Sequence, residues 1–153
     1  MKLKAIILLI VLFLSSGSLT EIRNLYSKVT DSNTKQKDFI EYMQKVEATK
    51  PVFQAYKGAS LVLQSKTTTD RKSKKEFFVQ GAELIENAVQ KDPENIEIRL
   101  IRLSVQENIP KALKYSSNIQ EDVALIQKNI DFTKDAELKL YVQQYIKQSK
   151  SFR

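Results

Sequence analysis

The sequence predicts an all-α protein: antiparallel helical hairpins, about seven helices in one domain. Glycine and proline occur only three times each in 153 residues, too few for the turns of a many-stranded sheet. Lysine, glutamate, glutamine and leucine, which favour helices, are abundant instead. Apolar residues also recur every three or four positions along most of the chain, as on one face of a helix.

The N-terminal segment has the composition of a secretory signal peptide. Two lysines precede an unbroken apolar run, Ala5–Leu14, which is followed by the small polar stretch Ser15–Ser18. This run is about half of the roughly 20 apolar residues that a membrane-spanning helix needs. We therefore expect residues 1–18 to be removed and residues 19–150 to form an exported domain, periplasmic or extracellular. An uncleaved signal anchor is the alternative.

Three helices are predicted in the first part of this domain. The third begins at Pro51, because proline has no N–H to lose at a first helical position. Its second face carries Gly58, which allows another helix to approach closely. The apolar faces of the three helices are, in order, Ile22, Leu25, Tyr26 and Val29; Phe39, Met43 and Val46; and Val52, Tyr56, Ala59 and Leu63.

A strongly polar stretch from Gln64 to Lys75 predicts a solvated loop before the fourth helix. The spacing of Ser73 and Glu76 is that of a capping box, so we expect this helix to begin near Ser73. Asp92 and Pro93 end it. It carries two neighbouring apolar stripes, and the stripe that contains Gly81 is expected to pack near the glycine of the third helix. The stripes are Phe77, Gly81, Leu84 and Ala88, and Phe78, Ala82, Ile85 and Val89.

The fifth helix, over residues 95–108, is predicted to be the most buried, because apolar stripes occupy two of its sides. Asn118 can cap a sixth helix, and a seventh is expected over residues 133–146. Residues 147–153 are expected to fray. The stripes of the fifth helix are Ile96, Leu100 and Leu103, and Ile98, Ile101 and Val105.

The fourth helix carries a resemblance to a known family. A tetratricopeptide repeat (TPR) closes with a small residue, a large apolar residue, a small residue and a proline. The residues at these positions here are Gly81, Ile85, Ala88 and Pro93. The resemblance covers about residues 51–95 and implies a helical hairpin that binds a partner in a groove, with no catalytic residue. Residues 92–110 are also similar to small uncharacterised exported bacterial helical proteins, which implies export.

The composition argues against most enzyme classes. The chain contains no histidine and no cysteine, which excludes zinc sites of those ligands, thiol nucleophiles, imidazole bases and disulfides. Glycine-rich phosphate loops and aspartate-rich calcium loops are absent as well. We therefore expect a protein that is not an enzyme and has no catalytic residues, cofactor or metal.

The charge is moderately basic. The chain carries a net charge of +7, or +5 without the two lysines of the predicted signal peptide. We interpret this charge as favouring solubility and weak attraction to anionic surfaces. Export leaves no role for nucleic acid, and we expect a monomer.

Eight residues are candidates for contact with a partner. Arg99, Arg102 and Gln106 lie on the narrow polar side of the fifth helix. The two arginines either pair with Glu86, Asp92 or Glu97, or grip a partner's carboxylate. The basic cluster is either a solvated loop or a contact for an anionic surface or acidic partner. Its members are Lys66, Arg71, Lys72, Lys74 and Lys75.

Two functions remain open on this reasoning. The first is an exported, non-enzymatic scaffold module that binds a protein or peptide on the surface between the third, fourth and fifth helices. The second is a structural or surface-associated envelope protein whose basic loop contacts an anionic surface. They differ in salt response, because contacts between exposed charges weaken steeply with ionic strength.

Overall fold

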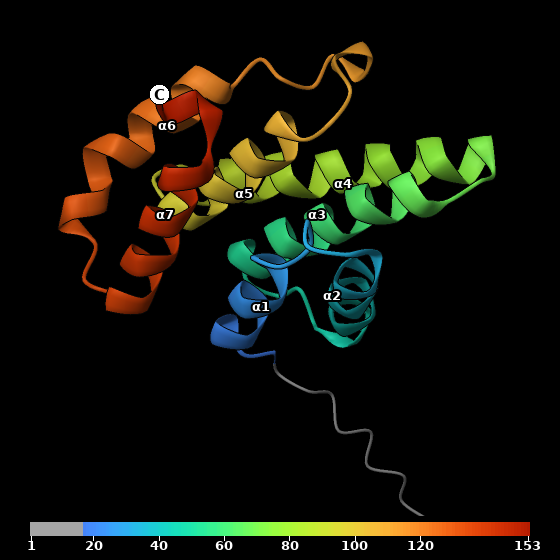
Figure 1. Cartoon of the computed structure of the whole chain (residues 1–153), viewed down its shortest axis with the longest axis horizontal. Coiled ribbons are helices and arrows are strands. Elements are labelled where there is room, and N and C mark those ends of the chain that lie inside the picture. The colour runs from blue at the N-terminus through green and yellow to red at the C-terminus, as the bar shows by residue number, and fades with distance from the viewer. Residues whose placement is uncertain (1–16) are drawn as a thin grey trace, which may run out of the picture.

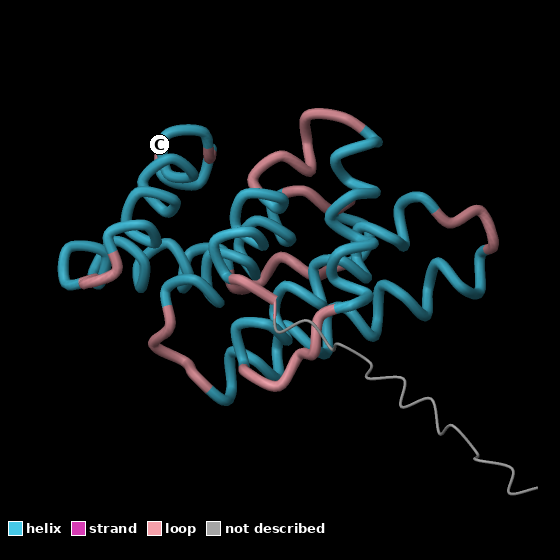
Figure 2. The backbone as a smooth tube through the Cα atoms, turned by 90° about the horizontal axis from the view of Figure 1, so that it is seen from below, coloured by secondary structure: helices cyan, strands magenta, loops and turns pink. Residues whose placement is uncertain are grey.

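The computed structural model describes residues 17–153. Within this range the chain folds into seven α-helices and three short 3-10 helices and has no strand, which confirms the all-α prediction (Figure 2). The predicted signal peptide lies almost entirely outside the described residues. The elements are α1 (Leu19–Tyr26), α2 (Asn33–Lys45), α3 (Pro51–Thr67), α4 (Arg71–Lys91), α5 (Ile96–Glu107), η1 (Lys111–Leu113), α6 (Ile119–Asn129), η2 (Ile130–Phe132), α7 (Ala136–Gln148) and η3 (Lys150–Phe152).

The long hairpin of α3 and α4 forms the axis of the molecule (Figure 1). Helices α1 and α2 pack on the α3 side, and α5 packs against both α3 and α4. Helices α6 and α7 lie at the end of the molecule opposite the hairpin tip. None of the helices in residues 17–153 combines the length and apolar character needed to cross a membrane.

Two glycines bring α3 and α4 together, as the sequence predicted. A Cβ atom on Gly81 would lie 2.6 Å from the carbonyl oxygen of Gly58 and 2.9 Å from a methyl group of Val62. A Cβ on Gly58 would in turn lie 2.5 Å from the carbonyl oxygen of Gly81. The backbones therefore approach so closely that neither position has room for a methyl group.

The predicted loop from Gln64 to Lys75 is wrong. Helix α3 continues to Thr67 and α4 begins at Arg71, so only three residues connect them. The N-cap is Asp70, whose carboxylate accepts a hydrogen bond from the Ser73 backbone N–H at 2.8 Å. The residues are polar because this end of the hairpin projects into solvent, and long polar side chains are good helix formers.

The other helix boundaries follow the sequence more closely. Helix α4 ends at Lys91, and the Asn95 side chain caps α5 by accepting hydrogen bonds from the N–H groups of Glu97 and Ile98. The expected fraying of residues 147–153 is wrong. These residues include η3, and Ser149 is buried and hydrogen-bonded to Glu107 of α5.

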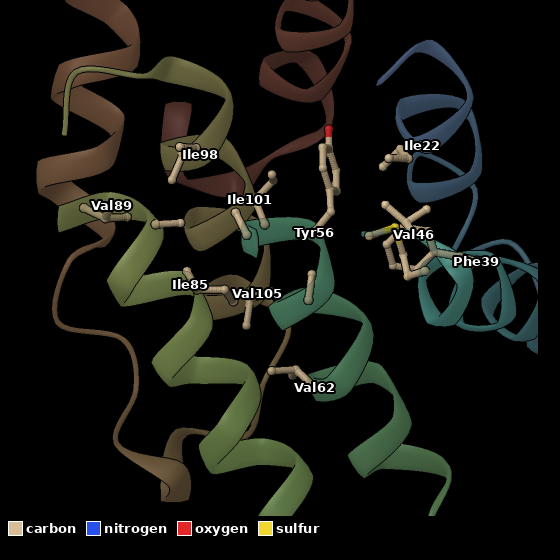
Figure 3. Packing of buried hydrophobic residues seen from close by; sticks show 14 residues of the cluster. Ile22, Phe39, Val46, Tyr56, Val62, Ile85, Val89, Ile98, Ile101 and Val105 are labelled. Carbon is tan, nitrogen blue, oxygen red and sulfur yellow. The ribbon is translucent and has the colours of Figure 1, made fainter. Parts of the chain in front are cut away.

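The core consists of two apolar clusters that share α5. Ile98, Ile101 and Val105 join the cluster formed with α1 to α4, where Tyr56 stands between α3 and the neighbouring helices (Figure 3). The opposite stripe of α5 joins a second cluster with α6 and α7. Every residue from Ile96 to Gln106 is buried, which confirms α5 as the most buried helix.

Replacement of Gly81 by alanine tests the close contact of α3 and α4. Alanine is the better helix former by about 1 kcal/mol, so this change at an exposed glycine would raise the free energy of unfolding. Here the new methyl group would push on backbone atoms, and we expect a net loss of about 1–3 kcal/mol in the free energy of unfolding. The urea midpoints of variant and parent show whether the change lowers or raises stability. Lys72→Ala at the exposed tip is the control and should leave the midpoint unchanged; a midpoint for Gly81→Ala at or above the parent's would contradict this packing.

Candidate functional site

A groove of about 1010 Å³ is the candidate site. Its lining comes from the end of α1, the turn after it, the first turn of α2 and one face of α3. The end of α5 and the segment that follows it also contribute, as do α7 and the C-terminal residues. Segments distant in sequence therefore meet at one concave surface, of the size at which proteins bind ligands.

Tyrosines and uncharged polar side chains dominate the lining of the groove. Tyr26, Tyr115, Tyr141 and Tyr145 all contribute to it. The apolar part of the lining includes Val29, Val62, Leu63, Val105 and Ile109. The amides are Asn33, Gln36, Gln106, Asn108, Gln144 and Gln148, and several serines lie between them.

The tyrosine hydroxyls are held in place and protonated. Tyr26 shares a hydrogen bond of 2.6 Å with Ser104 of α5, and Tyr145 donates to Glu107. Burial raises the pKa of Tyr26 to about 12 and raises the pKa of Tyr115, Tyr141 and Tyr145 as well. At neutral pH these hydroxyls therefore stay protonated, and those of Tyr26, Tyr115 and Tyr145 are already bound within the protein, so the tyrosines offer the groove mainly their aromatic rings.

Gln106 is the predicted site residue that does reach the groove from α5. Its side chain is 3% exposed, and its Nε2 donates to Asn118 at 3.3 Å. Its Oε1 is buried and has no hydrogen-bond donor. Among the buried side-chain nitrogen and oxygen atoms of residues 17–153, it is the one without a hydrogen-bond partner. A buried acceptor without a donor costs stability, and such sites concentrate where proteins function.

Arg99 and Arg102 are not available to a partner. They are 5% and 3% exposed, and both donate to Asp122 of α6, which is fully buried. Arg102 binds Asp122 through Nε at 2.8 Å and Nη2 at 2.6 Å, and it also reaches Glu86 of α4. The two arginines are therefore paired within the protein, with Glu86 as predicted and Asp122 as the main partner. The other two predicted partners are wrong, because Glu97 pairs with Arg23 and Asp92 accepts a hydrogen bond from Asn95.

The pairing keeps both arginines charged in the interior. Burial alone would lower the pKa of Arg102, but the hydrogen bonds and charges of Asp122 and Glu86 outweigh it and raise that pKa above its ordinary value. Glu86 also accepts a hydrogen bond from Tyr115 at 2.6 Å. One network thus fixes α6, α4 and the segment after α5 to α5 itself.

A second buried network joins α1 to α5. Arg23 donates two hydrogen bonds of 2.8 Å to the two carboxylate oxygens of Glu97, and the Tyr56 hydroxyl donates to the same carboxylate. Arg23 also reaches Asp135, which caps α7. These contacts hold the walls of the groove in position because α1 and α7 both line it.

The basic cluster is divided by the fold. Arg71, Lys72, Lys74 and Lys75 are exposed on the first turns of α4 at the hairpin tip, away from the groove. Lys66, in the last turn of α3, instead lines the groove and donates to the carbonyl oxygen of Asn108 at 2.8 Å. The eight predicted residues therefore fall into three places: the interior, the groove and the tip.

The spacing of charged and apolar residues in the sequence also indicates the buried ion pairs. Asp122 follows Ile119 by three residues and precedes Ile126 by four, so it lies within an apolar helical face. Arg23 likewise follows Leu19 by four residues and precedes Tyr26 by three. A charge centred on an apolar face predicts a buried partner, but its identity depends on helix packing that the spacing does not contain.

Residues 17–153 contain no group of three or more acidic side chains arranged to hold a metal ion. Comparisons with protein-family models, curated proteins and solved structures found no match. The resemblance to the tetratricopeptide repeat stays a prediction, although Gly81, one of the positions on which it rests, lies in the contact between α3 and α4.

Replacement of Asp122 by asparagine tests the buried network. The change leaves two arginines without their main counter-charge, and we expect a loss of about 3–5 kcal/mol in the free energy of unfolding. Glu121→Gln removes a neighbouring carboxylate that is 55% exposed, and we expect a loss below about 1 kcal/mol. Denaturant titration compares the two, and equal losses would show that Asp122 has no special role.

Glu107 should make the anchoring of the C-terminus sensitive to pH. Burial alone would raise the pKa of Glu107, but hydrogen bonds from Ser149, Ser151 and Tyr145 outweigh it and hold that pKa below its ordinary value of 4.5. A lowered pKa stabilises the fold above 4.5, and this contribution is lost as the pH falls through the folded-state pKa. Glu107→Gln should therefore lower stability at neutral pH and flatten its decline in acid.

Urea unfolding at several pH values between about 7 and 3 measures this effect. Other carboxylates also titrate in this range, so the informative quantity is the difference between variant and parent. Glu83→Gln, an exposed carboxylate on α4, is the matched control. A difference between Glu107→Gln and parent that stays constant with pH would refute the role of Glu107.

Proposed function

We propose that this protein is an exported, non-enzymatic helical module that binds a protein or peptide segment in the groove between α1, α3, α5 and α7. The observation that carries the proposal is the lining of the groove, which combines four tyrosines with amide side chains from several elements. Export is proposed from the N-terminal sequence, with its two lysines, apolar run and small residues.

The chemistry of the lining suits an extended peptide. Each peptide unit carries one N–H donor and one C=O acceptor, and asparagine and glutamine side chains carry both complements. Tyrosine offers a large apolar face with a polar tip, which gives contact area at low entropic cost. The TPR resemblance also implies partner binding in a groove.

The position of the proposed site differs from the sequence-based expectation. The surface between the third, fourth and fifth helices is packed interior, because α3 and α4 meet at Gly58 and Gly81 and α5 is buried from Ile96 to Gln106. The accessible concave surface is lined by residues of α3 and α5 together with α1 and α7, and by none of α4.

The basic hairpin tip supports a second candidate function, contact with an anionic envelope surface. Arg71, Lys72, Lys74 and Lys75 are exposed together there, with Asp70 and Glu76 as the nearby acids. Contacts of this kind are screened beyond a Debye length of about 8 Å at physiological ionic strength. Binding at the tip should therefore disappear in high salt, whereas groove binding should persist through its apolar contacts.

A matched pair of tryptophan variants separates the groove from the rest of the surface. Gln144 and Gln143 are adjacent and exposed on α7, but only Gln144 lines the groove. Peptides selected from a random displayed library on the parent protein should bind Gln143→Trp as they bind the parent. Gln144→Trp should weaken them by roughly tenfold or more, because the bulky ring occupies the groove. Fluorescence anisotropy measures both affinities.

The hairpin tip is tested in the same experiment. Lys74→Glu/Lys75→Glu should leave peptide affinity unchanged and abolish any binding to anionic phospholipid vesicles at low salt. Selected peptides that bind Gln144→Trp and Gln143→Trp equally well would contradict the groove proposal. Vesicle binding lost only in the tip variant, with no peptide binding at all, would favour the second candidate.

A further inference from the structure

The free charges along the groove are all positive. The lining contains four charged residues: Lys66, Lys111, Lys150 and Glu107. Glu107 already accepts hydrogen bonds from Tyr145, Ser149 and Ser151 of the protein itself. None of the three lysines forms an ion pair with any carboxylate in residues 17–153.

The three lysines come from separate elements placed around the groove. Lys66 belongs to α3, Lys111 to η1 and Lys150 to η3, and Lys111 and Lys150 are exposed. Convergence of unpaired cations from three elements, on a protein that elsewhere pairs its buried arginines, leaves a surface that attracts anions.

Lys66 shows the lack of a counter-charge most directly. Its ammonium group donates to the Asn108 carbonyl oxygen beside the groove, and it forms no ion pair within residues 17–153. Desolvation lowers the pKa of Lys66 because its charge has lost part of its hydration without gaining a charged partner. A carboxylate from a bound segment would supply that partner.

We propose that the groove binds an extended acidic segment of a partner protein. Its aspartate or glutamate side chains pair with Lys66, Lys111 and Lys150, and its apolar side chains lie against the tyrosine faces between them. This inference rests on the proposed function and specifies the chemistry of the ligand. The N-terminal segment of the chain itself does not match this description, because residues 1–20 contain two lysines and no acidic residue.

Three labelled peptides of equal length test the proposal. Each alternates valine and leucine with one polar residue, which is glutamate, glutamine or lysine. The protein is used as it accumulates in the producing cells, with its N-terminus determined by intact mass. At physiological salt the glutamate peptide should bind at least about tenfold more tightly than the glutamine peptide, and the lysine peptide should bind most weakly.

Charge reversal in the groove should reverse this order. Lys111→Glu/Lys150→Glu changes two exposed residues, so folding should be intact by circular dichroism, and it should reduce the preference for glutamate over lysine by roughly tenfold or more. Addition of Lys66→Glu should invert it. Lys128→Glu reverses the charge of an exposed residue of α6 outside the groove and should keep the parent's preference.

The outcomes are separable. Glutamine and glutamate peptides of equal affinity that are both weakened by Gln144→Trp would overturn the acidic specificity and leave the groove function standing. No detectable binding of any peptide would overturn both. A loss of glutamate-peptide binding in Lys128→Glu or Lys74→Glu/Lys75→Glu as large as in the groove variants would mean that net charge alone attracts the peptide, which also overturns the inference.

Discussion

The structure depends on a helix that is buried on every side. Helix α5 has apolar stripes toward two clusters, and its third side carries Arg99, Arg102 and Gln106. A charged group in the interior is tolerated only with a partner, because desolvation of an isolated charge costs several kcal/mol. Asp122 must therefore accompany the two arginines, and this requirement fixes α6 on the polar side of α5.

The same kind of constraint builds the groove. Arg23 and Glu97 join α1 to α5, Tyr115 joins the segment after α5 to Glu86, and Glu107 holds the C-terminal residues. Each wall is thus attached to α5 or its network by a charged hydrogen bond. Because charged pairs are directional, they set the relative position of the walls more narrowly than apolar contacts do.

The sequence predicted what depends on local periodicity. Both apolar stripes of α5 and the glycine contact at Gly81 lie within reach of helical spacing and are found as expected. Asp122, the main partner of Arg102, was missed because it lies 20 residues away on a helix whose packing against α5 the spacing does not contain. The groove could not be predicted because its lining extends from Tyr26 to Ser151. The predicted loop at the hairpin tip was wrong because the polar residues there indicate exposure to solvent, not the end of a helix.

Buried ion pairs are a costly way to stabilise a protein, since apolar residues of similar volume often give equal or greater stability. Their value here lies in preorganisation, because a groove whose walls are fixed before binding loses less conformational entropy when a ligand enters. In this protein the arginines and carboxylates of the interior neutralise one another, whereas the lysines of the groove are left without carboxylates. That separation gives the interior rigidity and leaves the positive charges of the groove free for a ligand, which connects the fold of α5 to the acidic partner proposed for the groove.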